Sequence, residues 1–171
     1  MNLTNYATER LILKPMQIED APFFLELVNT PKWKKYIGDR NVNTIEEAEN
    51  YIIERMLPQL KKLGYGNYLV IRKNGNVKIG TCGLYDREGI EGVDIGFAFL
   101  PEFEKKGFAF EAAQKIKSIG IDIFNISKIS GITIPENKAS QKLLEKLNLE
   151  FKKMIRLPND SEELMLYELI I

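Results

Sequence analysis

A short loop between a predicted strand and a predicted helix carries the first residues that could do chemistry. Lys105, Lys106 and Gly107 follow the strand-like run VDIGFAFL (93–100), and helical spacing of small and aliphatic residues begins at Ala109. The free N–H groups of a helix's first turn and the helix dipole favour negative charge at such a place. The loop therefore has the features of an anion site, although a glycine that only relaxes a turn is the more common case.

Several kinds of site are excluded or disfavoured by what the sequence lacks. The loop contains no G-x-G-x-x-G pattern, and no G-K-[ST] follows its glycine. The chain has no histidine and one cysteine, Cys82, which lies in a predicted strand. Ser-His-Asp and Cys-His catalysis are therefore excluded, and we expect no metal site. We expect Cys82 to be a small buried hydrophobic side chain, so chemistry falls to carboxylates, hydroxyls, lysines or backbone N–H groups.

Composition and charge limit the class of protein. The chain has 171 residues, 44% hydrophobic and 28% charged, which is typical of one soluble globular domain, here 1–171. Lysine plus arginine and aspartate plus glutamate number 24 each, so the zero net charge argues against a nucleic-acid partner. The sequence shows no apolar stretch of membrane-spanning length and no signal-peptide pattern, so we expect a cytoplasmic protein without a membrane partner.

The elements that must position these residues follow from hydrophobic periodicity. In the first part of the chain, the pattern predicts a strand at 10–16, a helix at 19–29, an irregular segment at 30–43 and a helix after Thr44. Thr44 and Glu47 have the spacing of a capping box. The helix that they open should bend at Pro58 and stop at Gly64.

The rest of the chain alternates strands with two helices. Strands are predicted at 66–73, 77–85, 93–100, 128–134, 150–157 and 163–171, and helices at 109–123 and after Asn137. Asn74-Gly75 predicts a type I′ hairpin turn, and Gly96 suggests a bulge or a close backbone approach. The connection from 93–100 to 128–134 should make these two strands parallel. The result is a mixed α/β fold, with a central twisted sheet of about six to seven strands and about four flanking helices.

The sequence resembles the GNAT superfamily of acyl-CoA N-acyltransferases, and most closely its RimJ/RimL-type branch. Four segments carry the likeness: TERLILKPMQIEDA (8–21), IGTCGLYDR (79–87), DIGFAFLPEFEKKGFAFEAA (94–113) and ITIPENKASQKLLEKLNLEF (132–151). They span nearly the whole chain in the family's order of elements. The resemblance implies a GNAT-like fold and an enzyme that transfers an acetyl group from acetyl-CoA to a primary amine, either a protein N-terminus or a small molecule.

The resemblance also implies how acetyl-CoA would be held. In the family, a loop resembling [QR]-x-x-G-x-[GA] cradles the coenzyme pyrophosphate through backbone N–H groups, and the preceding strand pairs with the pantetheine arm. The implied coenzyme-binding residues are Phe97, Ala98, Phe99, Lys105, Lys106, Gly107, Phe108, Ala109 and Asn137. Glu104 stands where the family usually has glutamine or arginine. We expect it to weaken binding without abolishing it, with Lys105 and Lys106 compensating for its charge.

Catalytic roles are likewise implied by the resemblance. A backbone N–H near Phe97 or Ala98 would stabilise the oxyanion, a contribution of roughly 3 kcal/mol. Asp94 is the candidate general base, and the alternative is that it only lies on a solvated side of its strand. Leu144 occupies the position of the tyrosine acid found in many relatives. The resemblance to the RimL-like branch implies a serine at the position of Ser140 as the proton donor to the leaving thiolate. As local physics alone, Ser140 is simply a polar residue in a first helical turn.

The acceptor amine is expected near the first two helices. Trp33 and Tyr36, with the segment 37–40, would provide aromatic surface and charge for an amine, whereas the alternative is that both aromatic rings fill the core. A second function class also stays open, a non-catalytic acyl-CoA-binding module that uses its ligand as a signal or a structural cofactor. The protein would be a monomer or a homodimer, and the apolar last strand, LMLYELII, could pair with a partner's sheet edge.

Overall fold

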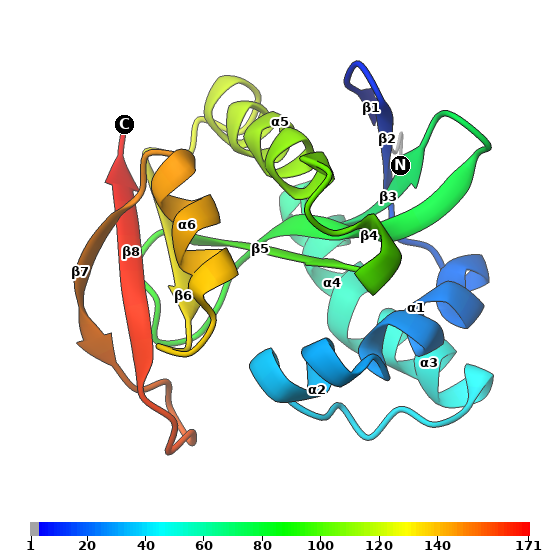
Figure 1. Cartoon of the computed structure of the whole chain (residues 1–171), viewed down its shortest axis with the longest axis horizontal. Coiled ribbons are helices and arrows are strands. Elements are labelled where there is room, and N and C mark those ends of the chain that lie inside the picture. The colour runs from blue at the N-terminus through cyan, green and yellow to red at the C-terminus, as the bar shows by residue number, and fades with distance from the viewer. Residues whose placement is uncertain (1–3) are drawn as a thin grey trace.

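One mixed sheet forms the centre of the molecule (Figure 1). The computed structural model describes residues 4–171, and in this range the sheet has eight strands in the order β1-β2-β3-β4-β5-β6-β8-β7. Their bounds are β1 (Tyr6–Ala7), β2 (Leu11–Pro15), β3 (Asn67–Arg72), β4 (Val77–Tyr85), β5 (Val93–Phe99), β6 (Lys128–Thr133), β7 (Glu150–Ile155) and β8 (Leu164–Ile170). The mixed α/β class and the parallel pairing of β5 with β6 are confirmed. The sheet exceeds the expected size because β1, only two residues long, is too short to show a period.

Helices cover both faces of the sheet. The bounds are α1 (Ala21–Val28), α2 (Pro31–Tyr36), α3 (Ile45–Tyr51), α4 (Leu57–Leu63), α5 (Phe108–Asp122) and α6 (Lys138–Lys146). Helices α1 to α4 pack on one face, and α5 and α6 pack on the other (Figure 1). The segment 30–43, for which the sequence offered a loop or a short helix, contains the six-residue helix α2.

The helical run from α3 to α4 follows its sequence signals. The Glu47 N–H donates to Thr44 Oγ1 at 3.1 Å, and the Thr44 N–H donates to Glu47 Oε2 at 3.1 Å, so the capping box is confirmed. Gly64 ends the run in the left-handed conformation, with φ 81°. The bend predicted at Pro58 takes the form of a π-helical turn, Ile52–Met56, just before it. A proline lacks the N–H of a regular helical bond and its ring crowds the carbonyl four residues earlier, which explains the interruption.

The alternation of side chains along β5 divides the core into two parts. Ile95 and Phe99 pack with α5 and α6, whereas Ala98 and Leu100 contact the apolar side of α1 to α4. Successive side chains of a strand point to opposite faces, so the even-numbered residues of β5 face α1 to α4. Asp94 belongs to this second set.

Two expectations about turns and bulges are wrong in detail. The hairpin between β3 and β4 exists, but its positive φ angles are at Gly75 and Asn76, not at both Asn74 and Gly75, so the turn is not type I′. A four-residue loop closes it, with the Asn76 N–H donating to the Lys73 carbonyl at 3.2 Å. At Gly96 the β4–β5 register runs without a shift, so no bulge is present there.

Two further sequence predictions concern the surroundings of Gly96 and the pairing of the last strand. A Cβ on Gly96 would lie 2.8 Å from the ring of Tyr85, so the close approach is confirmed. The last strand is not free to pair with a partner's sheet edge, because β8 lies between β6 and β7. Leu164, Leu166 and Tyr167 of β8 are buried there, and the more polar β7 occupies the edge, where charged residues discourage further pairing. No helix within residues 4–171 has the length and apolar character needed to cross a membrane.

Candidate active site

The sheet opens between β5 and β6. These strands pair only at Val93–Ile129 and Asp94–Ser130, although β5 continues to Phe99 and β6 continues to Thr133. Beyond Asp94, β5 therefore has a free edge on the side of β6, as the implied pairing of this strand with the pantetheine arm requires. A cleft of about 550 Å³ lies at the opening, and its walls come from both helical layers as well as from the strands.

The hydrogen bonds between β4 and β5 determine which backbone groups of β5 face the opening toward β6. The Leu100 N–H donates to the Ile79 carbonyl at 2.9 Å. Because bonding alternates along an antiparallel pair, the Ala98 N–H points to β4, and the Phe97 N–H points the opposite way, toward β6. The Ala98 carbonyl also faces β4, since a Cβ on Gly80 would lie 2.4 Å from it. Of the two expected oxyanion donors, this geometry selects the N–H of Phe97, the first on β5 beyond its pairing with β6.

Asp94 lies at the point where the strands separate. Its side chain is 2% exposed and lines the cleft, so the alternative of a solvated position is wrong. Arg87 Nε donates to Asp94 Oδ2 at 2.7 Å, while Oδ1 is buried without a hydrogen-bond partner in the described part of the chain. Burial raises the pKa of Asp94 to about 6, against the lowering influence of the Arg87 guanidinium and of the nearby backbone N–H of Ile132. Near neutral pH this carboxylate is thus ionised and a better proton acceptor than an exposed aspartate.

Tyr85, which was not among the site residues predicted from the sequence, lines the cleft opposite Asp94 on the neighbouring strand β4. The Tyr85 hydroxyl donates to Asn67 Oδ1 at 2.8 Å, and its ring packs against Gly96. Burial raises the pKa of Tyr85, so the phenol stays protonated. Tyr85 and Arg87 both belong to the segment IGTCGLYDR that carried part of the resemblance, but only the fold brings them to Asp94.

The loop before α5 offers a row of free backbone donors. Lys105 and Gly107 both have positive φ, 57° and 82°, and the first bond of the helix runs from the Glu111 N–H to the Gly107 carbonyl at 3.0 Å. Within residues 4–171, the N–H groups from Lys105 to Phe110 have no acceptor. Six free donors at the N-terminus of a 15-residue helix make a strong anion-binding surface.

Charges around this loop are arranged differently from the expectation. Glu104 forms an ion pair with Lys32 of α2, so its charge is balanced from another element. The Lys106 ammonium instead donates to the Glu102 carbonyl at 2.7 Å. Arg10 Nη1 donates to the Lys106 carbonyl at 3.0 Å, which places a further cation beside the loop. The Lys106 ammonium therefore stays beside the loop without contacting Glu104, and compensation by Lys105 and Lys106 remains a prediction.

The N-terminal end of α6 lies across the cleft from β5. Asn137 Oδ1 accepts the Ser140 N–H at 3.2 Å, which confirms the predicted N-cap, and both residues line the cleft. Leu144, one turn further, is buried against Gly131, where an added Cβ would lie 2.5 Å from its methyl group. Ser140 is therefore the hydroxyl that this helix brings to the cleft.

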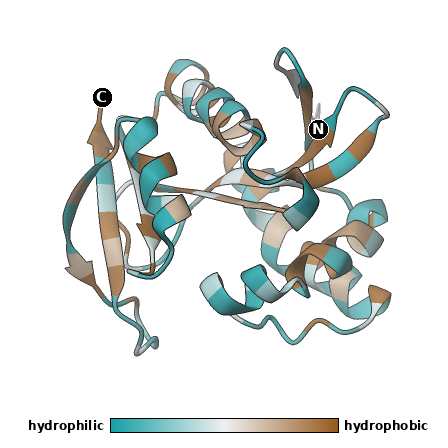
Figure 2. Ribbon diagram, in the orientation of Figure 1, coloured by the Kyte–Doolittle hydropathy of each residue, from teal (hydrophilic) through white to brown (hydrophobic). Residues whose placement is uncertain are grey.

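On the other side of the cleft lie the aromatic residues of α2. Trp33 and Tyr36 both line it, and the Trp33 ring packs edge-on against Phe24, with 6.1 Å between centroids. Trp33 thus both contacts the core and faces the cleft. Figure 2 shows the rest of α2 as hydrophilic, in keeping with its three lysines.

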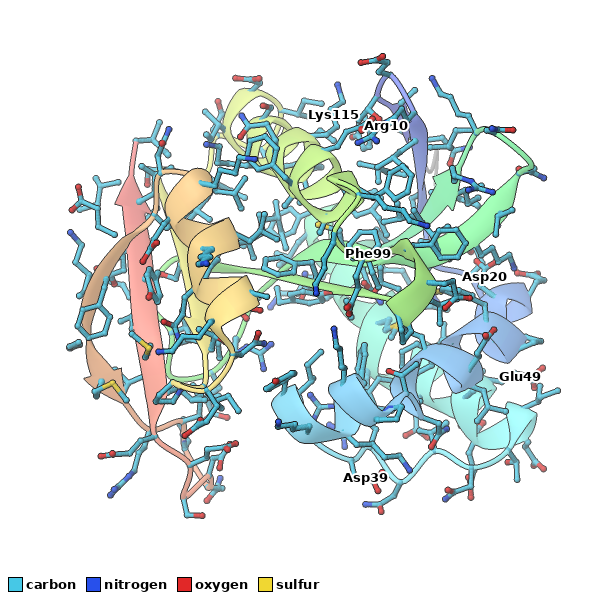
Figure 3. The ribbon with its side chains drawn as sticks, in the orientation of Figure 1. Arg10, Asp20, Asp39, Glu49, Phe99 and Lys115 are labelled. Atoms are coloured by element: carbon cyan, nitrogen blue, oxygen red, sulfur yellow. The ribbon has the colours of Figure 1, made fainter. Side chains whose placement is uncertain are left out.

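The cleft brings together most of the residues selected from the sequence. They are Asp94, Phe97 and Ala98 from β5, Asn137 and Ser140 from α6, and Trp33 and Tyr36 from α2. Lys105, Lys106, Gly107 and Ala109 lie in the adjacent loop and helix start instead. Phe99 and Phe108 are buried core residues, and Figure 3 shows Phe99 in the interior, so any ligand contact there falls to their backbone. Cys82 is buried as expected, and burial raises the pKa of its thiol.

Comparison with known proteins identifies the family to which this chain belongs. Residues 10–150 match the acetyltransferase (GNAT) domain family. The chain belongs to the GNAT acetyltransferases. An uncharacterized N-acetyltransferase, p20, of Bacillus licheniformis is 32% identical over 152 residues, which cover 87% of this chain and 84% of that protein. The uncharacterized N-acetyltransferase YoaA of Bacillus subtilis is 27% identical over 150 residues, with the same coverage.

Solved structures show the same fold. A GNAT-family acetyltransferase from Bacillus anthracis superposes with a TM-score of 0.79 at 24% identity, over 98% of both chains. RimL, a ribosomal L7/L12 alpha-N-protein acetyltransferase solved in complex with coenzyme A, has a TM-score of 0.83 at 18% identity, over 97% of both chains. The resemblance to the GNAT superfamily and its RimJ/RimL-type members is confirmed, and so is the GNAT-like mixed α/β fold.

Proposed function

We propose that this protein is an N-acetyltransferase that transfers an acetyl group from acetyl-CoA to a primary amine. One observation carries the proposal. A buried carboxylate with a free oxygen, Asp94 Oδ1, lies where β5 leaves β6, in the cleft that the first free backbone donor of β5, Phe97 N–H, also lines. A base for an amine and a donor for an oxyanion are the two groups that acyl transfer to an amine requires.

The residues present fit the coenzyme. The free N–H groups from Lys105 to Phe110 suit a pyrophosphate, which needs several donors at once. Lys32 neutralises Glu104, so this acidic side chain, which stands at the family's glutamine or arginine position, does not oppose the phosphates with a full charge. Acetyl-CoA would supply the activated thioester, and the unpaired edge of β5 would hold its pantetheine arm beside the cleft.

Asp94 would prepare the amine. An α-amino group has a pKa near 8, so much of it is protonated at neutral pH and must lose a proton before it can attack. Asp94, with a pKa of about 6, is ionised under these conditions and accepts that proton on Oδ1, directly or through a water. Arg87 holds the other oxygen and keeps the free one facing the cleft.

Phe97 and Ser140 would act on the acyl group. As the nitrogen–carbon bond forms, the carbonyl oxygen gains negative charge, which the Phe97 N–H stabilises. As the carbon–sulfur bond breaks, the sulfur leaves as a thiolate, and Ser140, which lines the cleft from α6, would give it a proton. The contribution of Ser140 is expected to be small, because a thiolate is already a good leaving group.

Calorimetric titration with acetyl-CoA, coenzyme A and ATP tests the binding half of the proposal. Micromolar binding of both coenzyme forms, without binding of ATP, supports it. Release of free thiol in the presence of an amine panel then tests turnover. If the protein binds acetyl-CoA but acetylates no amine, the proposal is wrong, and the protein uses acetyl-CoA without catalysis.

A further inference from the structure

Three residues that line the cleft each have a buried polar side-chain atom without a hydrogen-bond partner among the described residues. Trp33 Nε1, Arg40 Nε and Asp94 Oδ1 are all buried, and none has a hydrogen-bond partner among residues 4–171. Buried polar groups are nearly always paired in folded proteins, because an unpaired one carries the full cost of its desolvation. Three such atoms in one cleft point to a ligand that completes them.

Two of these atoms are donors from neighbouring parts of the chain. Trp33 lies on α2, and Arg40 follows it after a glycine at position 38. The acidic residue next to Arg40, Asp39, faces Lys34 at 3.7 Å and is thus already paired. In the described part of the chain, Arg40 forms no ion pair of its own. An indole N–H together with an unpaired guanidinium fits an anionic oxygen, and a carboxylate matches the planar guanidinium best.

The third atom, Asp94 Oδ1, is an acceptor, and we expect the amine of the acceptor to lie beside it. Asp94 Oδ1 can accept a proton or a hydrogen bond but cannot donate one once ionised. The loops after β4 and after β7, which touch at Gly89 and Pro158, add four more acidic side chains to the lining. These are Asp86, Glu88, Asp160 and Glu162.

Apart from Arg87, which lies in the loop after β4 and is paired with Asp94, the positive charge at the cleft comes from other elements. Arg40 follows α2 and Arg55 lies in the π-helical turn, and Figure 1 shows α2 well apart from the β7–β8 loop. The cleft therefore has a side that attracts an anion and a side that attracts a cation. A polyamine would leave Trp33 and Arg40 unpaired, and so would a simple alkylamine.

We propose that the acceptor is an amine that also carries a nearby carboxylate, with Trp33 and Arg40 binding the carboxylate and Asp94 facing the amine. This inference rests on the proposed acetyl transfer, because it names the acceptor for that reaction. The same chemistry occurs in a free amino acid and in a peptide whose first residue is acidic. The experiment below separates these two sources.

The test compares matched pairs of amines that differ only in the carboxylate. The pairs are L-alanine with L-alaninamide, β-alanine with β-alaninamide, and the peptide amide Asp-Ala-NH₂ with Asn-Ala-NH₂; spermidine serves as the polyamine. We expect kcat/KM to be at least about tenfold higher for the carboxylate member of one pair, as a charge-assisted contact implies. The pair that shows the preference identifies the source.

Two variants connect the preference to the named residues. Trp33→Phe removes the N–H and keeps a ring against Phe24, and Arg40→Gln removes the charge. Each should raise KM for the preferred carboxylate about tenfold while KM for its amide stays within twofold. Lys61→Gln, a loss of one charge on the exposed side of α4, is the matched control and should behave as wild type.

A direct binding signal separates failure of this inference from failure of the proposed function. Trp33 is the only tryptophan of the chain, so its fluorescence reports on the cleft without turnover. Acetylation of amines with no carboxylate preference, or a preference that persists in both variants, overturns this inference alone. Absence of acetylation with every amine overturns the proposed function. The carboxylate site itself would still stand in that case if the preferred compound, but not its amide, changed the Trp33 signal.

Discussion

Lys32 on α2 and Glu104 in the loop before α5 form an ion pair between segments that are 72 positions apart. Helix α2 carries Trp33 and Tyr36 at the cleft, while the loop carries the free N–H groups proposed for the pyrophosphate. The pair therefore connects the proposed acceptor side with the proposed coenzyme side. It also explains how an acidic residue can stand in a loop that is expected to bind phosphate.

Removing the charge of Lys32 and removing the charge of Glu104 should change the affinity for acetyl-CoA in opposite directions. Lys32→Gln leaves Glu104 unbalanced beside the phosphates and should weaken acetyl-CoA binding about two- to fivefold, the modest scale of an exposed ion pair. Glu104→Gln should tighten binding by a similar factor, and the double variant should return near wild type. Calorimetric titration at low and high salt measures all three. Tighter binding by Lys32→Gln would contradict this account.

Gly107 is expected to be essential to the loop. Its φ of 82° is strained for a β-branched residue, and a new Cβ would lie 3.2 Å from Arg10 Nη2. Gly107→Val should therefore weaken acetyl-CoA binding more than about tenfold by moving the N–H groups that follow. Gly107→Asn is the matched comparison, because asparagine adopts the left-handed conformation more readily and should retain most of the affinity. If both variants bound acetyl-CoA with the affinity of the wild type, the loop would not be the coenzyme-binding site.

Asp94 is expected to control the rate without controlling coenzyme binding. Asp94→Asn should lower kcat about a hundredfold or more, the usual contribution of a general base, and leave the affinity for acetyl-CoA unchanged. Because the base must be ionised, kcat/KM of the wild type should rise with pH through about 6, the pKa of Asp94. If Asp94→Asn had the wild-type rate at every pH, Asp94 would not be the general base.

Glu111 gives a prediction about stability and pH. Thr8 Oγ1, Arg10 N–H and Arg10 Nε all donate to its carboxylate, at 2.5 Å, 2.8 Å and 2.6 Å. Burial acts to raise the pKa of Glu111, but these bonds outweigh it and hold the pKa below its usual value. The stabilisation is therefore present above the unfolded-state pKa, and it is lost as pH falls through the lower folded-state value.

Urea unfolding of Glu111→Gln tests this sign. The variant should lose about 1 kcal/mol at pH 7, a small figure because Arg10 is partly exposed to solvent. The difference between variant and wild type should shrink as the pH falls below 4. A difference that is constant from pH 7 to pH 3 would mean that the ionised carboxylate contributes nothing.

Local signals in the sequence were sufficient for much of the fold. Thr44 with Glu47, Gly64 and Asn137 each mark a helix end correctly, because a cap depends on residues within one turn of chain. Period-two patterns placed β2 to β8 within a few residues, since one buried face imposes alternation on a strand. The resemblance added the coenzyme as the anion for this loop and the pairing of β5 with the pantetheine arm, and with them the residues proposed for chemistry.

Long-range packing decided the rest. The sequence by itself determined the elements, their ends and the family, because these depend on neighbouring residues and on motifs that are contiguous in the chain. Only the tertiary structure decided that Asp94 is buried with Arg87 on one oxygen, that Lys32 balances Glu104, and that β8 lies inside the sheet. Burial and ion pairing depend on which surfaces meet, and distance along the chain does not show this: Arg87 and Asp94 are 7 positions apart, whereas Lys32 and Glu104 are 72 apart.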